Sequence, residues 1–159
     1  MLPCVLASVS LLLPPLPDAS AFDKGSAAAL KEFSATTASN WVIPGRLKVG
    51  IGISDGEGCA MVAAPSDPTL KELSAVVADV EPRVRAGDEI LYVHGTDGSA
   101  DLICACLLAQ LYQLTADEGL ARVSAYAALR DDLPALTDEQ KQQCRDLVRI
   151  RRASDCAEE

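Results

Sequence analysis

Alternating and continuous apolar runs predict two β-strands in the middle of the chain. Apolar and polar side chains alternate over residues 41–51, which is typical of a half-buried strand. Residues 89–93 (EILYV) are mostly apolar and predict a short strand inside a sheet. Residues 54–65, between these two runs, are rich in Gly, Asp and Ser and predict a loop.

Apolar residues that recur at steps of three and four predict the first helix, over residues 68–85. Asp67 is suited to be its N-cap, and Pro68 suits the first helical position. Gly87 follows the periodic run and predicts the C-terminal stop.

Three further helices are predicted in the second half. Residues 102–114 are apolar almost all round, as expected of a helix buried in the middle of a domain. Capping boxes, Thr-x-x-Glu at Thr115 and Thr-x-x-Gln at Thr137, open helices over 116–130 and 138–150. The sequence therefore predicts an α/β fold in which helices cover a small sheet made of 41–51 and 89–93. We expect exposed apolar surface on one side of that sheet.

The N-terminal segment has the pattern of a targeting leader. Residues 2–13 form an apolar run that is too short to span a bilayer, and an Ala-x-Ala sequence ends at Ala21. We therefore expect a signal-peptide-like leader over 1–21 and a mature chain that starts near Phe22. The stretch Ala19–Phe22 also resembles the presequence cleavage site of complex plastids. Localisation is expected in the secretory pathway or such a plastid, and otherwise in the cytoplasm.

The remaining segments complete the expected organisation. Residues 22–40 are interpreted as a linker or transit-like segment, 41–152 as one domain, and 153–159 as a disordered tail. A chain of 159 residues has room for one domain.

Charge and cysteine content limit the classes of partner and cofactor. With 49% hydrophobic and 23% charged residues the chain is globular in composition, and its net charge of −9 disfavours nucleic acid and anionic lipid. The six cysteines form no Cys-x-x-Cys pair and His94 is the one histidine, so we predict no metal site and no cofactor. Structural thiols are the main interpretation, and redox or metal use is the alternative. A protein is the class of partner left open. We expect no transmembrane span in the mature chain, and the sequence does not determine the oligomeric state.

A strand, a glycine-bearing turn and a buried helix follow one another at residues 89–114. In many folds this order binds phosphate, because backbone N–H groups of the turn and helix N-terminus converge on an anion. From Tyr92 the chain reads YVHGTDGSADLICACLLAQLYQLTADEGLARVSAYAALR. This stretch resembles the active-site segment of the protein-tyrosine phosphatase superfamily, particularly its dual-specificity-like members. Residues 40–47 resemble the first strand of that family. Residues 53–56, with Pro65-Ser66-Asp67 after them, resemble its general-acid loop.

The resemblance implies a truncated, dual-specificity-phosphatase-like three-layer fold, with a small sheet flanked by helices. The family's segment is His-Cys, five residues, then Arg. Here Gly95 stands in the place of the nucleophilic cysteine and Asp101 in the place of the phosphate-binding arginine. The resemblance also implies that a piece of the family's fold is missing after Gly50. A glycine cannot attack phosphorus, and an aspartate repels the anion that an arginine would bind.

The resemblance assigns roles to a small group of residues. No catalytic residue is intact. Asp55 is interpreted as a solvated turn residue, with a general acid as the alternative. His94 is expected to be a structural, hydrogen-bonding histidine. Asp97 and Asp101 are expected to cap the loop, with a cation site as the alternative. The predicted anion loop comprises His94, Gly95, Thr96, Asp97, Gly98, Ser99, Ala100 and Asp101.

Two classes of function follow. The first is a non-catalytic binding or regulatory protein, a pseudophosphatase. The alternative is an active phosphatase-family hydrolase, represented by a divergent sequence or by a mis-assembled gene model. The glycine and the aspartate at the two key positions favour the first.

Overall fold

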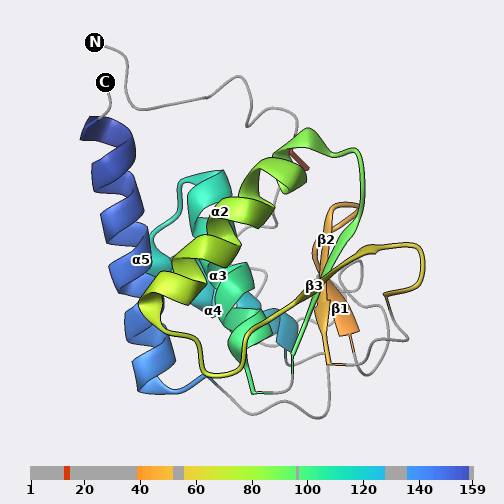
Figure 1. Ribbon diagram of the computed structural model, residues 1–159, viewed down its shortest axis with the longest axis horizontal. Coiled ribbons are helices and arrows are strands. Elements are labelled where there is room, and N and C mark those ends of the chain that lie inside the picture. The colour runs from red at the N-terminus through yellow and green to blue at the C-terminus, as the bar shows by residue number, and fades with distance from the viewer. Residues whose placement is uncertain (1–12, 15–38, 52–55, 96, 128–135, 158–159) are drawn as a thin grey trace.

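The computed structural model describes residues 13–14, 39–51, 56–95, 97–127 and 136–157. These ranges form an α/β fold with a four-stranded mixed sheet and four helices (Figure 1). In chain order, the elements are β1 (Ser39–Ile43), β2 (Leu47–Gly50), β3 (Ala60–Ala63), α2 (Leu70–Ala86), β4 (Leu91–His94), α3 (Ser99–Tyr112), α4 (Ala116–Ala127) and α5 (Asp138–Ala157).

The predicted strand over 41–51 is in fact a hairpin of two strands, and this part of the prediction is wrong. β1 and β2 pair antiparallel around a tight turn, in which the Arg46 N–H donates to the Ile43 carbonyl at 2.9 Å. Gly45 has φ +79°, a conformation that suits the third position of a Pro-Gly turn. The alternation was real, but the turn at Pro44 and Gly45 reverses the chain in its middle.

β3 lies inside the stretch 54–65 that the sequence predicted to be loop, and this prediction is also wrong. The sheet order is β1-β2-β4-β3, and β2, β4 and β3 are mutually parallel. β3 is a four-residue edge strand that pairs with β4 alone among the described strands. β4 lies between β2 and β3, as the apolar run at 89–93 predicted. Helix α2 provides the crossover that parallel neighbours β3 and β4 require.

Helix α2 begins two residues later than predicted. Thr69 is its N-cap and forms a capping box with Glu72, with hydrogen bonds of 3.1 and 2.9 Å. The prediction of Asp67 as N-cap is therefore wrong, because a complete capping box satisfies two backbone donors at once. Gly87 ends the helix at φ +72° as predicted, and its N–H donates to the Arg83 carbonyl.

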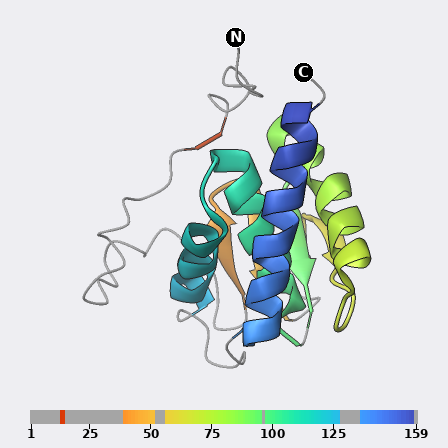
Figure 2. The same cartoon turned by 90° about the vertical axis from the view of Figure 1, so that its left-hand side faces the viewer.

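Figures 1 and 2 show the four helices gathered on one side of the sheet. α3 packs directly on β2 and β4, α4 packs on β1, and α5 lies outside α3 and α4. α3 is therefore enclosed by the sheet and by helices, and residues 99–111 are all buried. This arrangement explains the all-round apolar sequence of α3 and confirms the prediction that it is central.

The other face of the sheet carries fewer exposed apolar side chains than expected. Trp41, Lys48 and Tyr92 are aligned across β1, β2 and β4 by the strand register. The Lys48 ammonium lies 5.4 Å from the Trp41 ring centroid and 5.8 Å from the Tyr92 ring centroid. Lys48 therefore makes cation–π contacts with both rings. Tyr92 is fully buried, and Met61 is the one large apolar side chain of the described strands that is exposed.

The last two helices start as their capping boxes predicted. Thr115 and Glu118 exchange hydrogen bonds of 2.8 and 3.1 Å, and Thr137 and Gln140 exchange bonds of 2.9 and 3.1 Å. α5 continues to Ala157, beyond the expected domain boundary at 152 and into the segment expected to be a tail.

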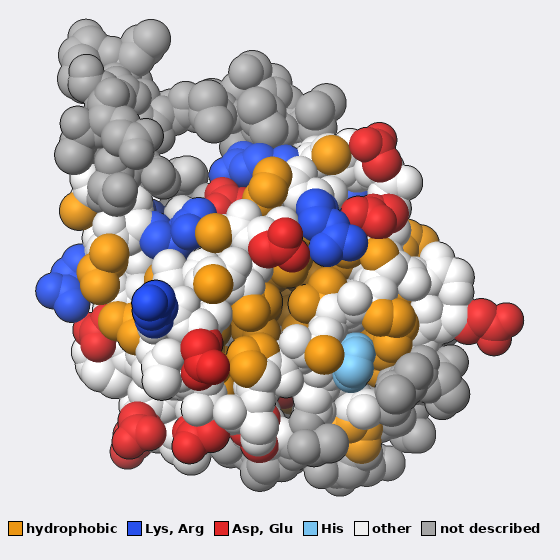
Figure 3. Space-filling model, viewed as in Figure 1, with side chains coloured by type: hydrophobic (Ala, Val, Ile, Leu, Met, Phe, Trp, Pro, Cys, Tyr) orange, Lys and Arg blue, Asp and Glu red, His pale blue; other side chains and the backbone are white. Residues whose placement is uncertain are grey.

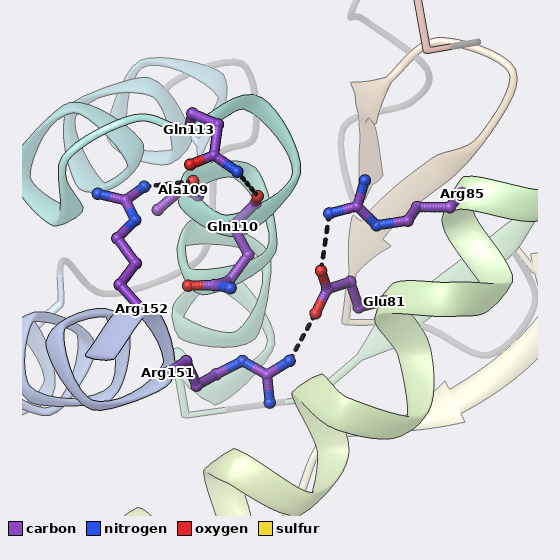
Figure 4. Close-up of polar contacts among 7 residues, drawn as sticks. All are labelled: Glu81, Arg85, Ala109, Gln110, Gln113, Arg151 and Arg152. Carbon is purple, nitrogen blue, oxygen red and sulfur yellow. Dashed lines mark hydrogen bonds and ion pairs between the residues drawn. The ribbon is translucent and has the colours of Figure 1, made fainter. Parts of the chain in front are cut away.

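A buried carboxylate connects α5 to α2 (Figure 4). The Glu81 carboxylate is 12% exposed and accepts one bond from Arg85 at 2.9 Å and another from Arg151 at 2.6 Å. Arg151 is 70 positions away in the sequence, so this contact exists only once α5 has packed. Both carboxylate oxygens are satisfied, as a buried charge requires.

Candidate functional site

The predicted anion loop 94–101 is shorter in the structure, because His94 ends β4 and Ser99–Asp101 belong to the first turn of α3. The connection between β4 and α3 lies at the carboxyl edge of the three parallel strands. β2, β4 and β3 end in register at Gly50, His94 and Ala63. The backbone continues this pairing, because the Gly95 N–H donates to the Gly50 carbonyl at 3.2 Å and the Ala64 N–H to the His94 carbonyl at 2.8 Å. In α/β folds this edge is where ligands commonly bind.

Gly98 is the residue that turns the loop into helix α3. It is the N-cap of α3 at φ +86°, a left-handed conformation that favours glycine, and its carbonyl accepts the Leu102 N–H at 3.0 Å. Gln140 at the start of α5 reaches across and donates to the Asp97 carbonyl at 3.2 Å. The sequence showed Gln140 as a capping residue but not as a support for this loop.

The Asp97 carboxylate accepts hydrogen bonds from both sides of the loop. Its Oδ1 accepts the backbone N–H of Ser99 at 3.1 Å. Its Oδ2 accepts the backbone N–H of Asp67 at 2.7 Å and the Ser66 hydroxyl at 3.2 Å. The Asp97 carboxylate thus bonds the first residue of α3 and also joins this turn to the segment after β3.

The environment of Asp97 favours its ionised form. Partial burial pushes the pKa of Asp97 upward, but hydrogen bonds from Ser99, Asp67 and Ser66 outweigh burial and hold that pKa below its ordinary value of 3.8. The Asp67 backbone has φ +46°, uncommon for a residue other than glycine, and its N–H bond to Asp97 holds it there. Sequence reasoning missed Ser66 and Asp67 as partners of the loop, because no local pattern links them to a residue 30 positions away.

Asp101 lies in the first turn of α3 and is 4% exposed. A carboxylate in the first turn of a helix is favoured by the helix dipole, which agrees with the expected capping role. Asp97 and Asp101 therefore both lie at the N-terminal end of α3.

Gly95, which directly follows β4, has little room for a side chain. A Cβ atom there would lie 3.1 Å from the Ala64 Cβ and 3.3 Å from the Ser99 Oγ, so its neighbours would have to move slightly. The His94 ring packs at 5.9 Å and 33° against the Tyr92 ring, which is a structural contact. Asp55 and Thr96 lie outside the described residues.

The described thiols fit a structural role. Cys104, Cys106 and Cys144 are free and buried, and Cys59 is free and partly exposed. A hydrogen bond with Cys144, together with burial, raises the pKa of the Cys106 thiol well above 9.0, so this thiol stays protonated and unreactive.

No protein-family model matches the chain, and no curated protein is detectably similar to it. Across the described ranges, no cluster of three or more His, Cys, Asp or Glu side chains could hold a metal ion. None of the described helices is long and apolar enough to cross a membrane. Acidic and basic side chains are interspersed on the face in Figure 3, so the negative net charge is not gathered there in one patch.

Proposed function

We propose that this chain is a non-catalytic relative of the protein-tyrosine and dual-specificity phosphatases, a pseudophosphatase with a truncated version of their three-layer fold. The order of β4, loop and α3, at the carboxyl edge of parallel strands, supports this relationship. Gly95 and Asp101, at the two positions where the family needs a thiolate and a guanidinium, support the loss of catalysis.

The observation that carries the proposal is the position of the Asp97 carboxylate. A phosphate at this loop would need the N–H groups at the start of α3, but Asp97 already accepts the Ser99 N–H at 3.1 Å. The loop thus carries its own anion. A second anion about 4 Å away would be repelled by about 4 kcal/mol at an effective dielectric of 20, before screening by salt.

Gly95 offers no nucleophile that could replace the thiolate in phosphoryl transfer. Transfer in this family begins with attack of a thiolate, and glycine has no side chain. A hydroxyl or thiol nucleophile elsewhere would need a base within hydrogen-bond reach. The remaining function is binding, and the class of ligand left open is a protein partner that does not need to present a phosphate.

Two measurements on the unmodified protein test the proposal. We expect no hydrolysis of an aryl phosphate above the buffer rate, and no rise in melting temperature with inorganic phosphate. Hydrolysis that disappears on Asp55→Ala or His94→Ala would show an active enzyme with another nucleophile and would overturn the proposal.

A restoration series tests the cause. Asp97→Ala combined with Asp101→Arg frees the Ser99 N–H and supplies a cation, so we expect melting temperature to rise with phosphate. The matched variant Gly95→Cys with Asp101→Arg retains Asp97, and we expect a much weaker response. Equal responses in the two variants would show that Asp97 does not block the loop.

A further inference from the structure

Two residues of the expected leader, Leu13 and Pro14, contact the folded domain. Leu13 is 7% exposed and belongs to the main cluster of buried apolar side chains. The Pro14 carbonyl accepts a hydrogen bond from the Tyr112 hydroxyl at 2.5 Å. Leu13 and Pro14 are 98 or more positions away from Tyr112 in the sequence, so these contacts are tertiary rather than local.

The partner of this segment is the C-terminal end of α3, which is itself firmly held. Gln113 ends the helix at φ +59°, and its side chain donates to the Gln110 carbonyl at 3.4 Å. Arg152 of α5 donates to the carbonyl of Ala109, as Figure 4 shows. Arg152 also donates to the Leu114 carbonyl. Tyr112 therefore presents its hydroxyl from a rigid position, which favours specific docking.

The sequence at this point lowers the entropy cost of docking. Leu13 and Pro14 each precede a proline, and a residue before proline is restricted to extended conformations. Fewer conformations are then lost when the segment orders. Tyr112 is half-buried, and the loss of solvent raises the pKa of Tyr112 to about 12.

We propose that Leu13 and Pro14 form a strap that docks in cis on the C-terminal end of α3, so that these two residues of the leader stabilise the folded domain. Cleavage near Phe22 would remove the strap and uncover the apolar site that Leu13 fills. Docking and processing of the leader are then linked. A chain that folds before cleavage retains the stabilising strap, whereas a cleaved chain lacks it.

The test uses the full-length chain with matched substitutions at Leu13. Leu13→Asp places a charge in the core and should lower the melting temperature by about 4–8 °C, whereas Leu13→Met, similar in volume, should change it by about 2 °C or less. In Leu13→Asp the titration of Tyr112 should move from about 12 toward its ordinary value of 10.0. Subtraction of a Tyr112→Phe spectrum isolates that tyrosine from the others.

A second experiment keeps Leu13 unchanged. A specific protease site placed between Ala21 and Phe22 allows the folded protein to be cut, and the cut should lower the melting temperature as Leu13→Asp does. If Leu13→Asp does not fold, the melting temperature of the cut protein decides whether the strap stabilises the fold. An unchanged melting temperature after cutting, or equal behaviour of Leu13→Asp and Leu13→Met, would overturn the proposal.

Discussion

The Asp97 carboxylate accepts the backbone N–H of Asp67 at 2.7 Å and so joins the loop after β4 to the segment after β3. The two residues belong to different turns at the same edge of the sheet. Asp97 also accepts the Ser99 N–H, so a single side chain both caps α3 and fixes the neighbouring segment.

Asp97→Asn should destabilise the protein by about 1 kcal/mol at neutral pH, because a charged acceptor of three donors is replaced by a weaker one. The native pKa of Asp97 is lowered, so its contribution is present above the unfolded value of 3.8 and is lost as pH falls through the native pKa. Urea unfolding of the unmodified protein and of Asp97→Asn should thus give different free energies of unfolding at pH 5–7. This difference should disappear below about pH 3.8. The control Asp88→Asn changes an exposed carboxylate, and it should change the free energy of unfolding by no more than about 0.5 kcal/mol.

Gly98→Ala should cost about 1 kcal/mol through backbone strain alone. Gly98 has φ +86°, while the nearest atom to an added Cβ, Leu136 Cδ2, lies at 3.5 Å, an ordinary contact. Gly98→Asn should therefore be milder than Gly98→Ala, since asparagine tolerates the left-handed conformation better. If the two variants unfold at the same denaturant concentration, strain is not the cause.

Gly119→Ala separates helix propensity from packing. Propensity alone predicts stabilisation of about 1 kcal/mol in the middle of α4. An added Cβ would, however, lie 2.6 Å from the Ala105 carbonyl oxygen of α3, so we expect destabilisation of about 1–3 kcal/mol instead. Thermal unfolding of Gly119→Ala and of the exposed control Ser124→Ala would decide the sign, and a stabilised Gly119→Ala would contradict the close approach of α3 and α4.

Glu81→Gln should destabilise the protein by about 3 kcal/mol, because Arg85 and Arg151 would lose the carboxylate that compensates their partly buried charges. Arg149→Met is the control, since Arg149 is 74% exposed in its pair with Asp146, and its change should stay within about 0.5 kcal/mol. The double variant Glu81→Met with Arg151→Met should recover part of the loss in chemical denaturation. Equal losses in Glu81→Gln and Arg149→Met would show that burial of this network is energetically unimportant.

Local sequence patterns determined the helices, because a helix depends on contacts within one or two turns. The capping boxes at Thr115 and Thr137 and the stop at Gly87 lie where the sequence placed them. The apolar strand before the loop, and the glycine and aspartate at positions 95 and 101, can likewise be read directly from the chain.

Tertiary structure alone decided the strand β3, the hairpin of β1 and β2, and the bonds that shape the loop. Ala60–Ala63 has no strong periodicity and is a strand only because β4 offers an edge to pair with. The contacts of Asp97 with Asp67, of Glu81 with Arg151 and of Tyr112 with Pro14 join residues 30, 70 and 98 positions apart. Such contacts form only after distant segments have been brought together, at an entropy cost that no local pattern records.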